Sequence, residues 1–572
     1  MPGFYITNLT PIAPICDIET KCLTDHMEAD SYHIWRTTRQ RYLDDKLFFQ
    51  NEKYVVILEG VILNKRELLE QHQKKSLQEL VLELLEEDPK QFYDRFRGMF
   101  SGAIYFRSQK SWLVFVDHLS NKALYYYVKD GKIIVGSTVE YVAETMKKNG
   151  ISRTVDPNGI LQSLAYSGFL DESTGISEIK RLMPCDYAWI SDGGASTHTY
   201  HVFSEEENTD LSNEEAIDLL NGAFRRAVKL ALDKDREYGY TSIVDISGGA
   251  DSRMIAYTVD ALGGNDSIGC HYSQSRSNDA TISQEIAQKL ELEFYGSNLD
   301  DAKFLKDVDM DVRMNSGAAL YSGFTGGRRM LEGLSGKNVG LEFTGLLGNM
   351  VDGGMLTKGG DEAPTLAHEN FVCDPTVDRS RLKVNTLTRF KTNDMFWQYV
   401  RGMLLGMNTF LIRQYYVEPY TPYGDVEFMQ AWLSIPWKQK VENKLLLRWM
   451  DREFPEAMKI SYATRERPLS VDLSPFEPFW KYYYYGKVVL KRKLLKKDAT
   501  NMNPFIKWEQ EKPWLLEWIR DYYHDGMSRL KDSGKLDYAL LGMIDKTYHS
   551  SNFAGKYVAL TVVSFCKQFL ID

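Results

Sequence analysis

The first 150 residues alternate short apolar runs with turn residues, a pattern typical of strands. Tyr54–Leu63 (YVVILEGVIL) is rich in β-branched residues and ends at Asn64–Lys65, so it predicts a buried strand. Leu77–Glu87 repeats Leu and Val at helical spacing. Four further strand candidates are Phe100–Phe106, Trp112–Val116, Ala123–Val128 and Lys132–Val135. The pattern predicts an α+β domain with packed antiparallel sheets.

The pattern changes after residues 151–210, which we expect to form a connecting segment with short strands. Ser212 and Glu215 have the spacing of a capping box before an apolar helical face. A buried strand is expected at Ser242–Ile246, followed by a glycine turn and a helix from about Arg253. The alternation continues through a strand, a helix and a strand at Ser267–Tyr272, Ala280–Leu290 and Glu293–Tyr295. Such alternation predicts a parallel α/β sheet, and beyond residue 390 the pattern is mainly helical.

Composition narrows the class of protein. The chain has 572 residues, enough for about two to four domains. Its 69 basic and 79 acidic residues give a net charge of −10, which argues against a nucleic-acid partner. The start does not resemble a signal peptide, and no stretch reaches about 18 uninterrupted apolar residues, so no membrane span is expected. The six cysteines are scattered without a CxxC pair, which fits reduced thiols in a cytoplasmic protein.

The most informative stretch is Ser242–Ser252 (SIVDISGGADS), where a buried strand runs through a glycine turn into a helix. Gly248 and Gly249 let the backbone approach a ligand, and the helix N-terminus favours an anion. Ser247 and Ser252 can donate hydroxyls to phosphate oxygens, and Asp251 can hold Mg²⁺. The alternative is a Ser-Gly-Gly turn that merely reverses the chain. The strand and helix on either side favour a phosphate site.

This stretch resembles a known family. SGGADS is similar to the SGGxDS pyrophosphate loop of enzymes that cleave ATP to AMP and pyrophosphate. Over roughly residues 50–470 the chain resembles asparagine synthetase-like proteins, in Leu58–Leu69, Phe96–Phe106, Val116–His118, Lys122–Tyr126, Gly175–Pro184, Val417–Asp425 and Lys444–Arg448. The resemblance implies an Ntn-type αββα sandwich at 1–205, a parallel-sheet ATP-pyrophosphatase domain at 206–475 and a helical extension at 476–572. It also implies ATP and Mg²⁺ as cofactors.

The N-terminal part departs from the family's glutaminase pattern. The family uses a cysteine after the initiator Met, whereas here Pro2 has neither a thiol nor a primary amine. The Asn of the family's oxyanion hole aligns with Glu59, whose carboxylate would repel a developing oxyanion, although Gly60 remains. Cys16 and Cys22 lie too far along the chain to replace the nucleophile. We therefore expect a domain kept for packing, without glutaminase activity.

The synthetase part departs as well. The family's GEGxDE motif aligns with Gly345–Gly354 (GLLGNMVDGG), which puts Leu346 and Asn349 in place of two acidic residues. If Asn349 opens a helix, Asp352 shares its face and can supply the missing carboxylate to Mg²⁺. The predicted metal ligands are therefore Asp251, Asn349 and Asp352. The alternative for Asp352 is a solvated residue before a glycine turn.

Candidate catalytic residues follow from the same alignment. The family's catalytic Lys aligns with Arg467, which can clamp an anion but cannot relay a proton as a Lys with a shifted pKa can. Lys444 can contact phosphate, although a helix-surface lysine is the default interpretation. Asp245 lies within a buried strand and needs partners, either backbone groups or the metal. Arg253 either reaches an anionic substrate or forms a structural salt bridge. The basic stretch 487–497 is a solvated helix face or a dock for an acidic partner or membrane surface.

These features favour an ATP-dependent amide-forming ligase. ATP would adenylate the carboxylate of a small molecule, peptide or glycan, and ammonia or an amine would displace AMP without glutamine hydrolysis by this chain. The alternative is a nucleotide-binding pseudoenzyme or scaffold subunit, which Leu346, Asn349 and Arg467 favour. The oligomeric state is left open, a homo-oligomer included.

Overall fold

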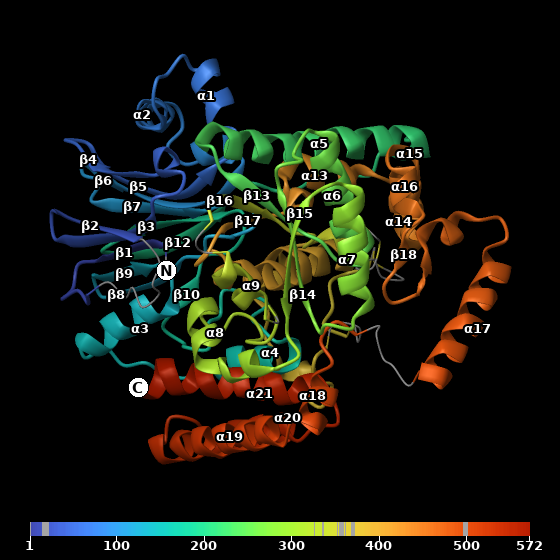
Figure 1. Cartoon of the computed structure of the whole chain (residues 1–572). Helices are drawn as coiled ribbons and strands as arrows, with labels where there is room; N and C mark the ends of the chain where they lie inside the picture. Colours follow the sequence, from blue (N-terminus) through green and yellow to red (C-terminus); the bar gives the residue numbers. More distant parts are fainter. Residues whose placement is uncertain are drawn as a thin grey trace.

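The computed structural model describes residues 2–13, 22–324, 326–334, 337–351, 353, 360, 362–367, 372–495 and 501–572. Figure 1 shows a two-sheet sandwich in blue and cyan beside a central parallel sheet, with the C-terminal helices beneath both. The fold is therefore mixed α/β, with antiparallel sheets first, a parallel sheet next and helices last, as the sequence predicts.

The N-terminal sandwich consists of two six-stranded sheets of antiparallel strand pairs. The first has the order β10-β8-β9-β1-β3-β2 and comprises Lys180–Arg181, Tyr125–Lys129, Lys132–Gly136, Gly3–Thr7, Tyr32–Arg39 and Cys22–Ala29. The second has the order β12-β11-β7-β6-β5-β4 and comprises Gly194–Thr199, Asp186–Ser191, Ser111–Val116, Gly98–Phe106, Tyr54–Ile62 and Leu47–Gln50.

Strand β5 shows why the strands of the sandwich have continuous apolar sequences. Its Val55 and Ile57 face the other sheet in one core cluster. Val56 and Leu58 face the opposite way and pack with α2 (Leu77–Glu87) in another. Because both faces are covered, alternation of polar and apolar residues is lost. Helix α3 (Val139–Lys148) covers the first sheet through β8 and β9, which completes the αββα layering.

The second domain is built on a five-stranded parallel sheet with the order β15-β14-β13-β16-β17. These strands are Glu293–Asn298, Ile268–Ser273, Thr241–Asp245, Val339–Phe343 and Glu418–Tyr420. The chain builds outward from β13 through β14 to β15, then returns to add β16 and β17 on the other side. The strand order therefore reverses between β13 and β16, and ligands bind open parallel sheets at such a point.

Three helices accompany the first strands of this sheet along the chain. Helix α5 (Asn213–Tyr238) begins with the predicted capping box of Ser212 and Glu215 and ends at Gly239 in the left-handed conformation. Helix α6 (Ala250–Ala261) follows β13 directly, and α7 (Asn278–Lys289) follows β14. The sequence placed the helix after β13 at about Arg253, but it begins three residues earlier, so Asp251 and Ser252 lie in its first turn.

The C-terminal helices contribute to the core of the molecule. Helix α21 (Phe553–Cys566) packs on α4 (Pro157–Tyr166), α8 (Val308–Asn315), α19 (Pro513–Ser533) and α20 (Tyr538–Tyr548). Over Phe553–Ile571 it is long and apolar enough to cross a membrane, yet 72% of its most apolar window is buried in the protein. Its composition is therefore that of a core helix.

Two of the strands that the sequence analysis missed contain few apolar residues. Strand β2 (CLTDHMEA) is an edge strand with alternating half-exposed positions, and β12 (GASTHT) is an exposed edge. Strand pairing rather than apolar character makes them strands.

Buried charges join the sandwich to the parallel-sheet domain. Glu418 of β17 is fully buried and its Oε2 lies 2.7 Å from Nζ of Lys122, which precedes β8. Asp45 of the sandwich forms a buried ion pair with Lys234 of α5, at 3.1 Å. Asp235, next to it, accepts hydrogen bonds from Tyr42 Oη and Ser242 Oγ. Separating the two domains would remove a charged or hydrogen-bonding partner from each of these buried groups, which is costly.

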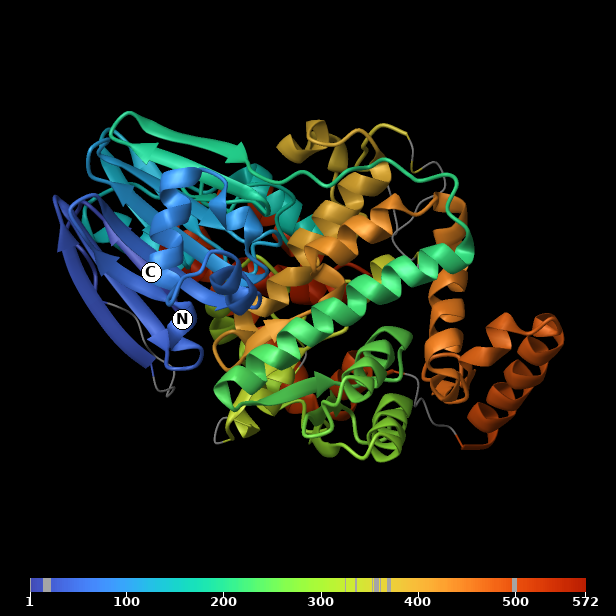
Figure 2. The same ribbon diagram turned by 90° about the horizontal axis from the view of Figure 1, so that it is seen from above.

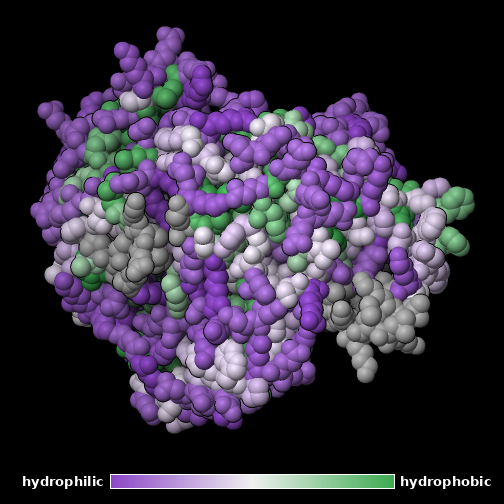
Figure 3. All heavy atoms as spheres, viewed as in Figure 1, coloured by the Kyte–Doolittle hydropathy of each residue, from purple (hydrophilic) through white to green (hydrophobic). Residues whose placement is uncertain are grey.

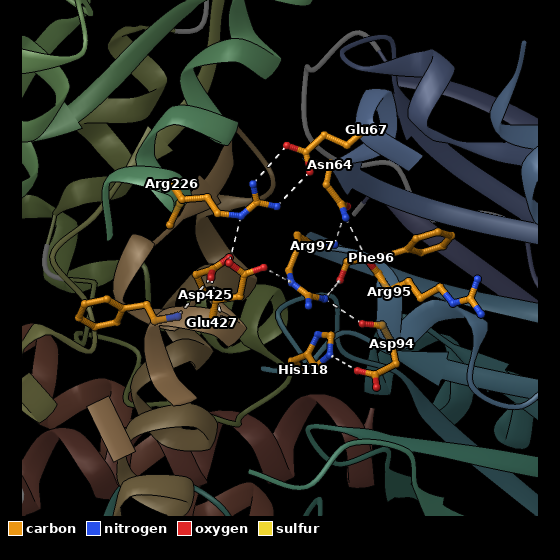
Figure 4. A network of polar contacts seen from close by, with 12 residues as sticks. Asn64, Glu67, Asp94, Arg95, Phe96, Arg97, His118, Arg226, Asp425 and Glu427 are labelled. Atoms are coloured by element: carbon orange, nitrogen blue, oxygen red, sulfur yellow. Dashed lines mark hydrogen bonds and ion pairs between the residues drawn. The ribbon is translucent and has the colours of Figure 1, made fainter. Parts of the chain in front are cut away.

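The interface also has a half-exposed rim, seen in Figure 4. Arg226 of α5 contacts Glu67 of α1 (Lys65–Gln71) at 3.0 Å and Glu427 of α13 (Val426–Ser434) at 3.0 Å. Arg97 of the sandwich lies 4.0 Å from Glu427.

We expect Lys122→Met to lower the free energy of unfolding by about 3 kcal/mol or more, because it leaves the Glu418 carboxylate buried without its ion-pair partner. Urea titration of the full chain measures this. The matched control is Lys53→Met, which breaks the exposed Lys53–Glu86 pair and should change the stability far less. Equal losses in the two variants would contradict the structural weight given to the buried pair.

Candidate functional site

A cavity of about 210 Å³ opens at the carboxyl edge of the parallel sheet, where the strand order reverses. It is lined from three strands and their following loops: Asp245, Ile246, Ser247, Gly249, Asp251 and Ser252 after β13; Cys270, His271 and Tyr272 of β14; Thr344, Gly345 and Leu346 after β16; and Arg413 and Met502. Met502 belongs to the C-terminal region, and its carbonyl oxygen accepts a hydrogen bond from the Gln274 N–H after β14.

The Ser-Gly-Gly turn is held by hydrogen bonds within the protein. The Ser247 N–H donates to Ser252 Oγ at 3.0 Å, and the Gly249 N–H donates to Ser247 Oγ at 3.2 Å. The Gly248 N–H donates to Asp279 Oδ1 of α7 at 2.9 Å. The Asp279 carboxylate thus satisfies a backbone donor that a phosphate oxygen could take. Burial raises the pKa of Asp279.

The two glycines of the turn have different surroundings. A Cβ on Gly248 would lie 2.3 Å from Cβ of Ala463, so the backbone there approaches a neighbouring segment closely. A Cβ on Gly249 would meet only Ser247 Oγ, at 3.3 Å, and its φ of −82° suits any residue. Gly248 is therefore required by packing, whereas the side of Gly249 is open toward the cavity.

The structure brings Asp251 next to the loop that follows β16. A Cβ on Gly348 would lie 2.4 Å from Cγ of Asp251, so this carboxylate sits directly over Gly348. Asn349 is the next residue and is exposed on α10 (Gly348–Val351). The expected neighbours Asp251 and Asn349 therefore come from adjoining backbone segments. Asp352, the third predicted metal ligand, lies outside the described residues.

Three charged side chains sit under this cavity. Arg413 of α12 (Phe410–Arg413) donates to Asp245 Oδ2 at 2.8 Å and to Glu342 of β16. Its guanidinium also lies 4.0 Å from the ring centroid of Phe324. Asp245 thus finds its partner in an arginine, which neither alternative from the sequence anticipated. Two acids share one fully buried base, so the group carries a surplus negative charge when both are ionised.

The pKa shifts around Arg413 reflect that surplus. Burial raises the pKa of Glu342 to about 8 against the attraction of Arg413, and nearby Asp245 adds to the rise. For Arg413, burial is outweighed by Glu342 and Asp245, which raise its pKa. Glu342 therefore carries a proton at neutral pH while Arg413 stays charged.

The hairpin of β18 (Ser461–Tyr462) and β19 (Arg467–Pro468) packs over the Ser-Gly-Gly turn. Arg253 of α6 is fully buried and donates to the carbonyl oxygens of Ala457, Ile460 and Ser461 and, at 3.4 Å, of Gly248. Arg253 therefore fixes this hairpin through main-chain oxygens. The expectation that it reaches a substrate or forms a salt bridge is wrong.

The two predicted catalytic residues lie outside the lining of the cavity. Arg467 pairs with Asp472, its Nη2 lying 2.6 Å from Asp472 Oδ1. It is close in the fold because its strand partner Tyr462 precedes Ala463, which packs on Gly248. Lys444 begins helix α15 (Lys444–Glu453) and is exposed.

The basic stretch 487–497 begins in α17 (Glu477–Leu495), and most of its side chains lie outside the described residues. This helix projects from the body in both ribbon views (Figures 1 and 2). Its first part exposes large aromatic side chains, and Figure 3 shows apolar atoms at this tip. The most exposed are Phe476, Phe479, Tyr482, Tyr483 and Tyr485.

The residues that the sequence analysis compared with a glutaminase centre include a buried ion pair. Pro2 is buried directly before β1. Glu59 on β5 is fully buried, its Oε1 lies 3.1 Å from Lys46 Nζ, and it accepts from Thr38 Oγ1 at 2.8 Å. Gly60 keeps a φ of +131°, with its α-carbon against the main chain of Met99.

Sequence reasoning missed Arg413 and Glu342. Glu342 stands alone as a charge in the buried strand VGLEF, and Asp245 does the same in TSIVD. Two acids on neighbouring parallel strands, close to the same sheet edge, require a buried cation, and that signal could have prompted a search for one. Nothing in the local pattern identifies Arg413, which lies 168 residues from Asp245 in the chain.

We expect Glu342→Gln to flatten the pH dependence of thermal stability. The folded protein holds the Glu342 proton up to about pH 8, against a reference pKa of 4.5, so this stabilising contribution is complete below 4.5 and lost as pH rises through 8. The melting temperature of the wild type should fall over this window more steeply than that of the variant. Glu293→Gln, an exposed acid paired with Lys337, is the control and should follow the wild type. If the melting temperatures of Glu342→Gln and the wild type depended on pH in the same way, the raised pKa assigned to Glu342 would be contradicted.

Comparisons with known proteins bear on the N-terminal part. A family model described as a glutamine amidotransferase domain matches residues 44–201. No curated protein matches the chain. Two solved structures are similar to it at 12% identity. One is an allosteric regulatory enzyme of purine biosynthesis, with a TM-score of 0.23, matched over 46% of this chain and 58% of that chain.

The other is the glutamine phosphoribosylpyrophosphate amidotransferase from B. subtilis, with a TM-score of 0.21, matched over 41% of this chain and 50% of that chain. The matches therefore span about half the length of each structure. Residues 44–201 lie within the two-sheet sandwich and its connection to α5. The chain thus contains a glutamine amidotransferase-type domain at its N-terminal end.

Proposed function

We propose that the chain is an ATP-dependent carbon–nitrogen ligase that adenylates a carboxylate and transfers the acyl group to ammonia or an amine. The observation that carries this proposal is the position of the SGGADS turn. It joins β13 to the N-terminus of α6 at the point where the strand order reverses, and it lines the cavity there.

The described side chains suggest how the nucleotide would be held. The open side of Gly249 and the first turn of α6 would face the pyrophosphate group. Asp251 and Asn349 would bind Mg²⁺, with Asp352 as the proposed third ligand, and the metal would offset the phosphate charge. Asp279 would have to leave the Gly248 N–H for a phosphate oxygen to bind there.

The chemistry would run in two steps. A substrate carboxylate attacks the α-phosphorus of ATP, and pyrophosphate leaves with the bond electrons. The amine then attacks the acyl carbon, loses a proton and releases AMP. Arg467 would contact phosphate only if its pair with Asp472 opened, whereas Lys444 would contact phosphate from the start of α15. Substrates would be a small-molecule, peptide or glycan carboxylate and an amine, without a nucleic-acid partner, in the cytoplasm.

A second candidate is a nucleotide-binding protein without turnover. It is favoured by Leu346, which lines the cavity where the family places an acid, and by Asp279 on the Gly248 N–H. Pyrophosphate release against a panel of carboxylates, with and without amines, separates the two. Binding of ATP without pyrophosphate release under any condition would favour this second candidate.

We expect Gly249→Val to weaken ATP binding by more than ~10-fold, because the new side chain would fill the approach of the phosphates. The fold should tolerate it, since only Ser247 Oγ lies nearby. Asp251→Ala should weaken binding mainly in the presence of Mg²⁺. Titration calorimetry with and without Mg²⁺ measures both. The control is Gly542→Val on α20, where a Cβ meets nothing within 4 Å. Unchanged affinity in both test variants would mean that the turn has only a structural role.

We expect no glutamate release from glutamine by the full chain. Pro2 offers no nucleophile, and Glu59, which the resemblance aligns with the family's oxyanion Asn, is a carboxylate paired with Lys46. A coupled glutamate assay tests this. Release above the buffer rate that disappears in Glu59→Ala would show that the sandwich hydrolyses glutamine by another route.

A further inference from the structure

A cluster of metal-ligating side chains lies in the sandwich, apart from the cavity on the parallel sheet. Asp94 Oδ1 lies 2.8 Å from His118 Nε2 and 3.0 Å from His201 Nδ1. The three ligand atoms are all within 4.8 Å of one another. Figure 4 shows the Asp94 carboxylate facing the His118 ring. Neither the proposed ligase chemistry nor the amidotransferase-type domain gives these residues a role.

We propose that Asp94, His118 and His201 form a binding site for a divalent transition-metal cation of the zinc type. Two imidazoles and one carboxylate are the ligand set that Zn²⁺ takes in sites with an open fourth position. Bonds of 2.0–2.2 Å in a tetrahedron separate ligand atoms by about 3.3 Å, so the two short contacts need to open by only a few tenths of an ångström. Mg²⁺ prefers oxygen ligands and would not fit.

The three ligands are held in place by their surroundings. Asp94 lies in the short 3₁₀-helix η2 (Phe92–Arg95), and Arg97 Nη1 donates to its carbonyl oxygen at 2.8 Å. His118 is buried in a turn fixed by Asp117, which accepts from the Leu119, Asn121 and Phe100 N–H groups. Ligands that are positioned before binding cost little to organise.

His201 is set by the segment after β12, where the preceding Tyr200 donates to the Val116 carbonyl oxygen at 2.9 Å. The two imidazole rings meet edge to face, with centroids 4.9 Å apart. The site would therefore tie together η2, the end of β7 and the end of β12. A metal there would cross-link these three segments at the edge of the sandwich that meets the second domain.

Charged groups of both signs surround the site. Arg97 opposes a cation, and Glu427, 4.0 Å from Arg97 Nε, offsets that charge. The acids Asp117 and Asp425 line the small cavity beside His118.

A fourth ligand has room beside His118. A cavity of about 20 Å³, lined by Arg97, Asp117, His118 and Asp425 among others, lies at the domain interface. That volume holds one water molecule.

The test is Zn²⁺ binding to the full chain, stripped with a chelator and titrated without nucleotide. We expect one tight equivalent in the wild type, weakened ~100-fold or more in Asp94→Asn and in His201→Gln. Zn²⁺ should also raise the melting temperature of the wild type, while Mg²⁺ should not. Co²⁺ in its place should give the intense visible bands of a four-coordinate site.

Two variants control for other histidines. His198→Ala removes an exposed histidine on β12, and His33→Ala breaks the exposed cluster of His26, Glu28 and His33. Both should keep the tight equivalent. Its absence in the wild type, its retention in both test variants, or its loss in His33→Ala would overturn the proposal. If the metal-free Asp94→Asn variant melts at a lower temperature than the metal-free wild type, its loss of Zn²⁺ binding could reflect misfolding. The Zn²⁺ affinity of His201→Gln, at a half-buried position, then decides the test. Because the assay contains no ATP, its outcome is independent of the ligase proposal.

Discussion

The buried charges at the domain interface constrain the rest of the structure. Glu418, Asp45 and Asp235 are almost fully buried, and each has a partner on the other side of the interface. A buried ion pair adds little net stability compared with apolar packing, but separating it leaves a costly bare charge. Such pairs make the relative position of the two domains specific. The contact between the parallel sheet and the sandwich is therefore fixed by specific charge partners.

That constraint gives the N-terminal domain a structural role. Lys46 pairs with Glu59 within the sandwich, and its charge also acts on Glu418 of β17. The Glu418 carboxylate therefore depends on two cations of the N-terminal domain, Lys122 and Lys46. The amidotransferase-type match covers this same domain.

The sequence was sufficient where one local pattern determined the structure. The apolar strand before SGGADS, the capping box at Ser212 and the alternation of strands and helices predicted β13, α5 and the parallel sheet within a few residues. It failed where distant residues complete a group. Arg413, Glu342 and Asp245 meet only through the fold, as do Asp279 and Gly248 or the pair Glu59 and Lys46. A single sequence indicates that a buried acid needs a partner, but it does not identify the partner residue.

The central claim is that nucleotide binds where the strand order reverses, over the open side of Gly249. The most direct measurement is a structure of the full chain with a non-hydrolysable ATP analogue and Mg²⁺. The account predicts the triphosphate between β13 and β16, the metal on Asp251, and Asp279 displaced from the Gly248 N–H. A nucleotide bound elsewhere, or a turn that keeps its Asp279 contact with no phosphate beside it, would contradict the account.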